Sequence, residues 1–224
     1  MAEGLRFSAV RPASRRDRAA LWFALVGTLC WFVPGWLRWH NLRSGASDLG
    51  IFDQAVWLMA HGRAPFVTTI GINVFADHVS PVLLLFVPLY RLAATPIWLL
   101  GVQALCLGLT VIPMRALADE LHAPRWIATL AILGSATLLS AATYDVHPVV
   151  FAVPAVAWAL LAAHRGDVRM ATIAGVTVAL CRADAVTALV GIAILAPPAV
   201  RRRLLWLVPV PFAASIVVPR VLGT

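Results

Sequence analysis

The chain has 224 residues, of which 61% are hydrophobic and only 12% are charged, and its mean hydropathy is +0.87. This composition excludes a disordered chain and a soluble enzyme, because either would have to expose most of these apolar side chains to water. The 18 basic residues are all arginines and outnumber the 10 acids, but in so apolar a chain they are interpreted first as a membrane-topology signal, not as a nucleic-acid patch.

Uncharged runs follow one another along the chain after an arginine-rich tail at residues 1–18. About 20 apolar residues in a helix cross the ~30 Å hydrocarbon core of a bilayer. The chain is therefore predicted to be an all-α polytopic transmembrane protein with a single membrane domain over residues 19–224. The seven expected spans are 19–37, 92–114, 126–144, 148–163, 170–181, 185–200 and 204–222.

The placement of the arginines predicts the orientation of these spans. If the N-terminus is cytoplasmic, the inner segments hold twelve of the 18 arginines, including the cluster Arg201, Arg202 and Arg203. Cytoplasmic loops are enriched in arginine, so this orientation is preferred. It leaves a long outer loop over residues 38–91, with two helices expected in the membrane interface at about 48–61 and 79–90.

The outer loop contains the first group of polar residues, in the sequence Asp48-Leu-Gly-Ile-Phe-Asp53-Gln. Asp48 stands where the first interfacial helix should begin, so it either caps that helix or presents a carboxylate at the membrane surface. Asp53 falls on the polar side of the same helix and is either solvated or a second functional acid. Both carboxylates are candidate site residues.

Two histidines lie in short motifs on the same side of the membrane. His78 follows Asp77 in the sequence Asp-His-Val-Ser-Pro and is a candidate proton shuttle, metal ligand or phosphate contact, or an ordinary hydrogen-bonding residue. Asp145 and His147 occupy the short turn Asp-Val-His-Pro between two spans. An Asp and a His at this spacing can hold one divalent cation, but Asp145 can equally cap the turn, so the need for a metal stays open.

Arg182 and Asp184 interrupt the apolar run near the outer ends of two short spans. Charged groups at membrane depth are costly, so the pair is expected to face protein or a water-filled cavity. On a regular helix, neighbours two apart point about 200° away from each other, so Arg182 is expected to lack Asp184 as a partner and to bind a lipid phosphate instead. The alternative is a structural ion pair.

Together these four motifs resemble a family of bacterial predicted membrane proteins of uncharacterised function. That family is in turn similar to the GT-C superfamily of membrane glycosyltransferases. The resemblance covers roughly residues 40–200 and implies an N-terminal module with seven spans and a long first outer loop that holds interfacial helices and a catalytic acid. This chain departs from the family pattern at Ala183, which separates Arg182 from Asp184, and it stops at Thr224. A further C-terminal half or a partner subunit is therefore expected.

The resemblance implies transfer of a sugar from a polyprenyl-phosphate donor on the outer face of a bacterial cell membrane. Asp48 would then be the general base, with Asp53 second, and His78, His147, Arg182 and Asp184 would bind substrate. A divalent cation, if one is used, would be held by Asp145 and by His147 or Asp48. The alternative function is a non-catalytic membrane subunit or a transporter of a lipid-linked substrate built on the same module.

Overall fold

A computed structural model describes residues 17–44 and 48–222 of the chain. The predicted tail at 1–18 therefore lies outside the described residues, except for Asp17 and Arg18. The described part is helical apart from two antiparallel two-residue strands, β1 (Phe66–Val67) and β2 (Ile72–Asn73). The prediction of an all-α polytopic membrane protein is confirmed.

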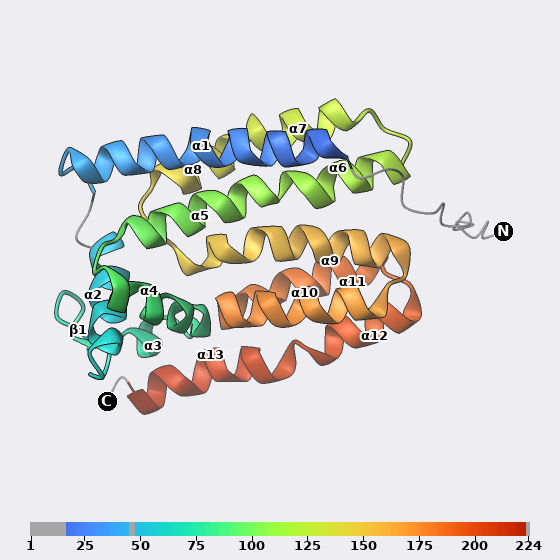
Figure 1. The fold of residues 1–224 in the computed structure, drawn as a ribbon. Helices are drawn as coiled ribbons and strands as arrows, with labels where there is room; N and C mark the ends of the chain where they lie inside the picture. Colours follow the sequence, from blue (N-terminus) through green and yellow to red (C-terminus); the bar gives the residue numbers. More distant parts are fainter. Residues whose placement is uncertain (1–16, 45–47, 223–224) are drawn as a thin grey trace.

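Five helical segments of the described chain are long and apolar enough to cross a membrane, and they lie side by side in a bundle (Figure 1). Several consist of consecutive helices with a bend between them. They are α1 (Arg18–His40), α5 with α6 (Ile97–Leu109, Val111–Glu120), α7 with α8 (Arg125–Leu133, Ala136–Thr143), the 3-10 helix η2 with α9 (Pro148–Ala152, Val153–Arg165), and α12 with α13 (Pro198–Trp206, Pro209–Leu222).

Two of the seven expected spans are short helices. Segments 170–181 and 185–200 correspond to α10 (Val168–Cys181) and to the 3-10 helix η3 (Ala183–Val186) continued by α11 (Thr187–Leu195). The 14 residues of α10 rise only about 21 Å, which is less than the thickness of the hydrocarbon core. We call α10, η3 and α11 the half hairpin, because it enters the bundle from the N-terminal end and turns back inside it (Figure 1).

The loop between the first two long helical segments, predicted to be an outer loop, folds into a cap at the opposite end of the bundle (Figure 1). The cap comprises α2 (Leu49–Ala60), β1, β2, α3 (Val74–Asp77), the 3-10 helix η1 (Pro81–Phe86) and α4 (Val87–Leu92). Helix α2 buries one face, because its apolar side chains recur at helical spacing, and it ends before Gly62, whose φ of 69° suits glycine. The predicted second interfacial helix at 79–90 corresponds to η1 and α4.

The tip of the half hairpin meets the cap directly. The backbone N–H of Ala183 donates to the carbonyl oxygen of Val79 at 2.9 Å, and the ring of Phe86 in η1 packs against that of Phe151 in η2 at 5.4 Å. The cap helices thus fill the depth that the short hairpin leaves unoccupied (Figure 1). This contact brings the segment that follows His78 against the segment of Arg182 and Asp184.

Ion pairs join the helices at the N-terminal end. The buried guanidinium of Arg115 in α6 donates to Asp17 Oδ2 through Nε and Nη2 at 3.0 and 2.9 Å, and to Thr129 Oγ1 in α7 at 2.7 Å. Arg165 in α9 donates to Glu120 at 2.8 Å. These charges are held between helices, which is the arrangement that charged groups near a membrane require.

Helices α1 and α5 approach most closely at Gly108. A methyl group added to Gly108 would overlap the carbonyl oxygen of Ala24 and the hydroxyl of Thr28. Small residues at such crossings let two membrane helices pack backbone to backbone.

Replacing Gly108 by alanine is therefore expected to push α1 away from α5 and to destabilise the protein by about 1–3 kcal/mol, the usual range for overpacking. The thermal midpoint of the purified protein in detergent measures the effect. The matched control is Gly101→Ala in the same helix, where the added methyl would meet only the ring of Phe32 at 3.9 Å. Equal midpoints for the two variants would contradict the close approach.

Candidate functional site

Asp48 and His147 meet where the cap joins the bundle. Asp48 precedes α2, and its carboxylate makes no capping hydrogen bond to that helix. Instead, Asp48 Oδ1 lies 3.9 Å from His147 Nε2, and both side chains are partly exposed. The distance is too long for a hydrogen bond but short enough for attraction when the imidazole is protonated. The interpretation of Asp48 as a side-chain cap is wrong, and its carboxylate faces an imidazole.

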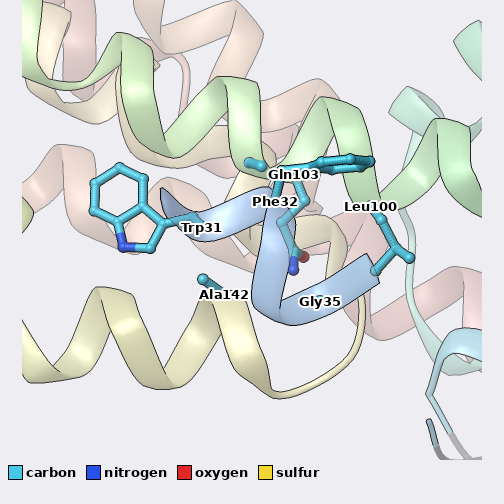
Figure 2. A pocket seen from close by; sticks show the side chains of 7 residues that line it. Trp31, Phe32, Gly35, Leu100, Gln103 and Ala142 are labelled. Atoms are coloured by element: carbon cyan, nitrogen blue, oxygen red, sulfur yellow. The ribbon is translucent and has the colours of Figure 1, made fainter. Parts of the chain in front are cut away.

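The buried amide of Gln103 in α5 holds the turn that carries His147. Gln103 Nε2 donates to the carbonyl oxygens of Ala141 and Asp145 at 3.2 and 3.1 Å, and Gln103 Oε1 accepts from the backbone N–H of His147 at 3.1 Å. Figure 2 shows this side chain among residues of α1, α5 and α8, in a gap too small for a water molecule. The gap is packing around the amide and not a ligand pocket.

Sequence reasoning missed Gln103. It stands alone in an uncharged apolar run, and a lone amide in such a run is itself a signal. Every one of its polar atoms must find a partner inside the protein, because the bilayer offers none. The partners lie some 40 residues away along the chain, so the sequence does not identify them.

Replacing Gln103 by leucine is expected to destabilise the protein by about 1–3 kcal/mol, because the His147 N–H loses its buried acceptor. Hydrogen–deuterium exchange of the segment 144–148 should rise together with the fall in thermal midpoint. Gln54→Leu is the control, because Gln54 bonds only to Thr68 in the cap. Unchanged exchange at 144–148 would show that the amide does not hold the turn.

His147 and Asp145 differ in their surroundings. The imidazole of His147 stacks on the ring of Tyr144, with centroids 5.7 Å apart and planes at 6°, whereas Asp145 is buried. Within residues 17–44 and 48–222, no three His, Cys, Asp or Glu side chains are grouped so that they could hold a metal ion. The predicted pair therefore gains no third protein ligand from the described chain.

Asp53 is engaged elsewhere in the cap. The hydroxyl of Tyr90 in α4 donates to Asp53 Oδ1 at 2.7 Å, which ties α4 to α2. Burial raises the pKa of Asp53, and the hydrogen bond from Tyr90 opposes part of that rise. Burial also raises the pKa of Tyr90, helped by the nearby Asp53 charge. The geometry favours a structural role for Asp53 and leaves Asp48 as the more available acid.

His78 lies beside the contact between the cap and the half hairpin. Its Nδ1 is 2.6 Å from Asp77 Oδ2, and its ring meets that of Phe52 edge-on at 6.4 Å. The neighbouring Val79 carbonyl accepts from Ala183, so His78 is close along the chain to the contact with the tip. Ser80 follows, fully buried, and its hydroxyl has no hydrogen-bond partner among the described residues. Sequence reasoning did not single out Ser80.

Arg182 and Asp184 form a bidentate ion pair, so the prediction that they could not face each other is wrong. Arg182 Nε and Nη2 donate to Asp184 Oδ1 and Oδ2 at 2.7 and 3.0 Å. The prediction assumed a continuous helix, but Arg182 has φ −159° and ψ 127°, which is extended backbone. The helix is broken at Arg182 and resumes as η3 at Ala183, so the angle of about 200° that a continuous helix sets between the two side chains does not apply. Arg182 therefore already has an anion as partner.

The structure thus brings together Asp48 with His147, Asp77 with His78 and Arg182 with Asp184. The hydrogen bond from Ala183 to Val79 joins the two segments that carry the last two pairs. One protein-family model, described as "Predicted membrane protein (DUF2079)", matches residues 38–219 of the chain. No curated protein and no solved structure matches the chain significantly.

Proposed function

The chain belongs to this family of predicted membrane proteins, and we propose that it is a membrane glycosyltransferase, or a module of one. In this proposal it transfers a sugar from a polyprenyl-phosphate donor on the outer face of the membrane. The family description supplies only the membrane location. Support for the finer function comes from the arrangement of the polar motifs and from their resemblance to GT-C enzymes.

The observation that carries the proposal is the pair formed by Asp48 and His147. Glycosyl transfer needs a base that removes the proton from the acceptor hydroxyl while that oxygen bonds to the sugar and the bond from sugar to phosphate breaks. Asp48 has a free carboxylate on a helix start, 3.9 Å from the imidazole. His147 would orient the Asp48 carboxylate toward the acceptor.

The leaving phosphate needs positive charge, because the departing oxygen takes the electron pair of the broken bond. A guanidinium has five N–H donors, and Asp184 occupies only two of those of Arg182. Asp184 would therefore orient the Arg182 side chain. The remaining N–H groups of Arg182 would bind the phosphate of the lipid-linked sugar. His78, whose other ring nitrogen is not used by Asp77, is the proposed second contact.

Replacing Asp48 by asparagine should lower transfer by about 10²- to 10⁴-fold, the usual contribution of a general base. The assay uses the full chain in proteoliposomes with a radiolabelled polyprenyl-phosphate sugar and a membrane extract as acceptor. Asp53→Asn is the matched control and should retain most of the activity, since that carboxylate bonds to Tyr90. The opposite ranking would make Asp53 the base.

If the wild-type protein binds the lipid-linked sugar but transfers none, the enzyme proposal fails. Movement of the donor across the proteoliposome membrane would then support the transporter, and activity restored only by a second chain would support the non-catalytic subunit. Transfer that persists after exhaustive chelation would remove a divalent cation from the mechanism.

Replacing Arg182 by glutamine should weaken binding of a polyprenyl phosphate on the order of 10-fold or more, because one charge-assisted contact to phosphate is lost. Native mass spectrometry of the folded monomer measures the affinity. Arg63→Gln, an exposed arginine of the cap, removes the same charge from the outer loop and should leave binding unchanged. Unchanged affinity in the Arg182 variant, or a loss seen only when the monomer unfolds, would leave Arg182 a structural residue.

A further inference from the structure

A second polar site lies at the N-terminal end of the bundle, opposite the cap. There α12 and the start of α10 enclose a cleft of about 480 Å³. One face of α12 lines it with residues at helical spacing, and two residues of α10 one turn apart line the other side. The lining residues are Ala199, Arg202, Arg203 and Trp206 of α12 and Val168 and Thr172 of α10.

Two guanidinium groups and no carboxylate line this cleft. Arg203 Nε donates to Thr172 Oγ1 at 2.9 Å, which fixes one guanidinium across the cleft and leaves its other nitrogens free to donate. Arg202 has no hydrogen bond or ion pair within the described part of the chain. Asp167 precedes the lining residue Val168 at the start of α10, and its carboxylate caps the helix by accepting from Met170 N–H.

Three other arginines at this end of the bundle have partners within the protein. Arg201 donates to the carbonyl oxygens of Ala193 and Ile194 at 3.0 and 3.3 Å, and Arg115 and Arg165 are paired with acids. Arg202 and Arg203 therefore lie together in one cleft without an acidic partner among the described residues. Their positions favour an anionic ligand from outside the chain.

Apolar surface continues from the cleft along the bundle. Trp206 is 73% exposed, as interfacial tryptophans commonly are, and Ile173 and Leu180 of α10 are 60% and 49% exposed. Val176, one turn after Thr172 on α10, is 40% exposed, so the apolar surface begins at the edge of the cleft. The arginine-lined cleft and the apolar surface beside it fit a ligand with an anionic head and apolar chains better than they fit a free phosphate ion.

We propose that the cleft between α10 and α12 binds the headgroup phosphate of an anionic phospholipid in the leaflet at the N-terminal end of the bundle. Arg202 and Arg203 grip the phosphate, Trp206 packs beside the glycerol region, and the acyl chains lie along α10. Basic pockets between membrane helices commonly bind such headgroups. The site is independent of the proposed function, because it lies at the other end of the molecule.

The test titrates the full-length protein in detergent with phosphatidylglycerol and counts bound lipid by native mass spectrometry. Each arginine near a lipid headgroup contributes on the order of 5-fold in affinity, so Arg202→Gln should weaken binding about 5-fold and the double change Arg202→Gln with Arg203→Gln on the order of 30-fold. Arg18→Gln is the control, since Arg18 is exposed at the same end of the bundle but on α1. It should leave the affinity unchanged.

Arg202→Gln alone decides the case if the double variant does not fold, because Arg202 makes no contact that folding requires. Retention of wild-type affinity in that variant overturns the proposal. Equal binding of phosphatidylcholine also overturns it, since the net negative charge would then be irrelevant. If inorganic phosphate at millimolar concentration displaces the lipid completely, the cleft is a free-phosphate site and the lipid assignment is wrong.

Discussion

The buried amide of Gln103 is the interaction on which the candidate site depends. It bonds to the backbone at Ala141, Asp145 and His147, so a residue of α5 fixes the turn between α8 and η2. Without these bonds, three backbone groups of a turn inside the bundle would lack partners, and each such group costs about 1–3 kcal/mol. Because the turn is held, the imidazole of His147 is placed toward Asp48.

The half hairpin is the second constraint. Helix α10 is too short to cross the membrane, and Arg182 ends it in extended backbone. The polar tip therefore lies within the bundle, where its charges must be satisfied, and the pair with Asp184 does so. The cap closes over the tip through the hydrogen bond from Ala183 to Val79. A break in one helix thus brings Arg182 and Asp184 against the cap segment that follows His78.

Charged side chains have different partners at the two ends of the bundle. At the N-terminal end, Arg115 and Arg165 bind acids of neighbouring helices, so most charge there stabilises packing. Arg202 and Arg203 instead line a cleft and have no acidic partner among the described residues. At the cap end, each pair combines an acid with a histidine or an arginine and remains partly exposed. Partial exposure leaves these groups accessible to a polar substrate.

Hydropathy alone determined that the chain is helical and spans a membrane, because the free energy of burying a helix in lipid is nearly a sum over its own residues. The positions of most helices and the order of the four polar motifs follow from the same local information. The length of segment 170–181 alone already indicated that it is too short to cross the hydrocarbon core as one helix. The sequence left the pairing of Arg182 with Asp184 only as an alternative, because the pair depends on a break in the helix at Arg182. Likewise, only the tertiary structure decided that Asp48 faces His147, that Asp53 binds Tyr90 and that Gln103 holds the turn, since each contact joins residues at least 37 positions apart.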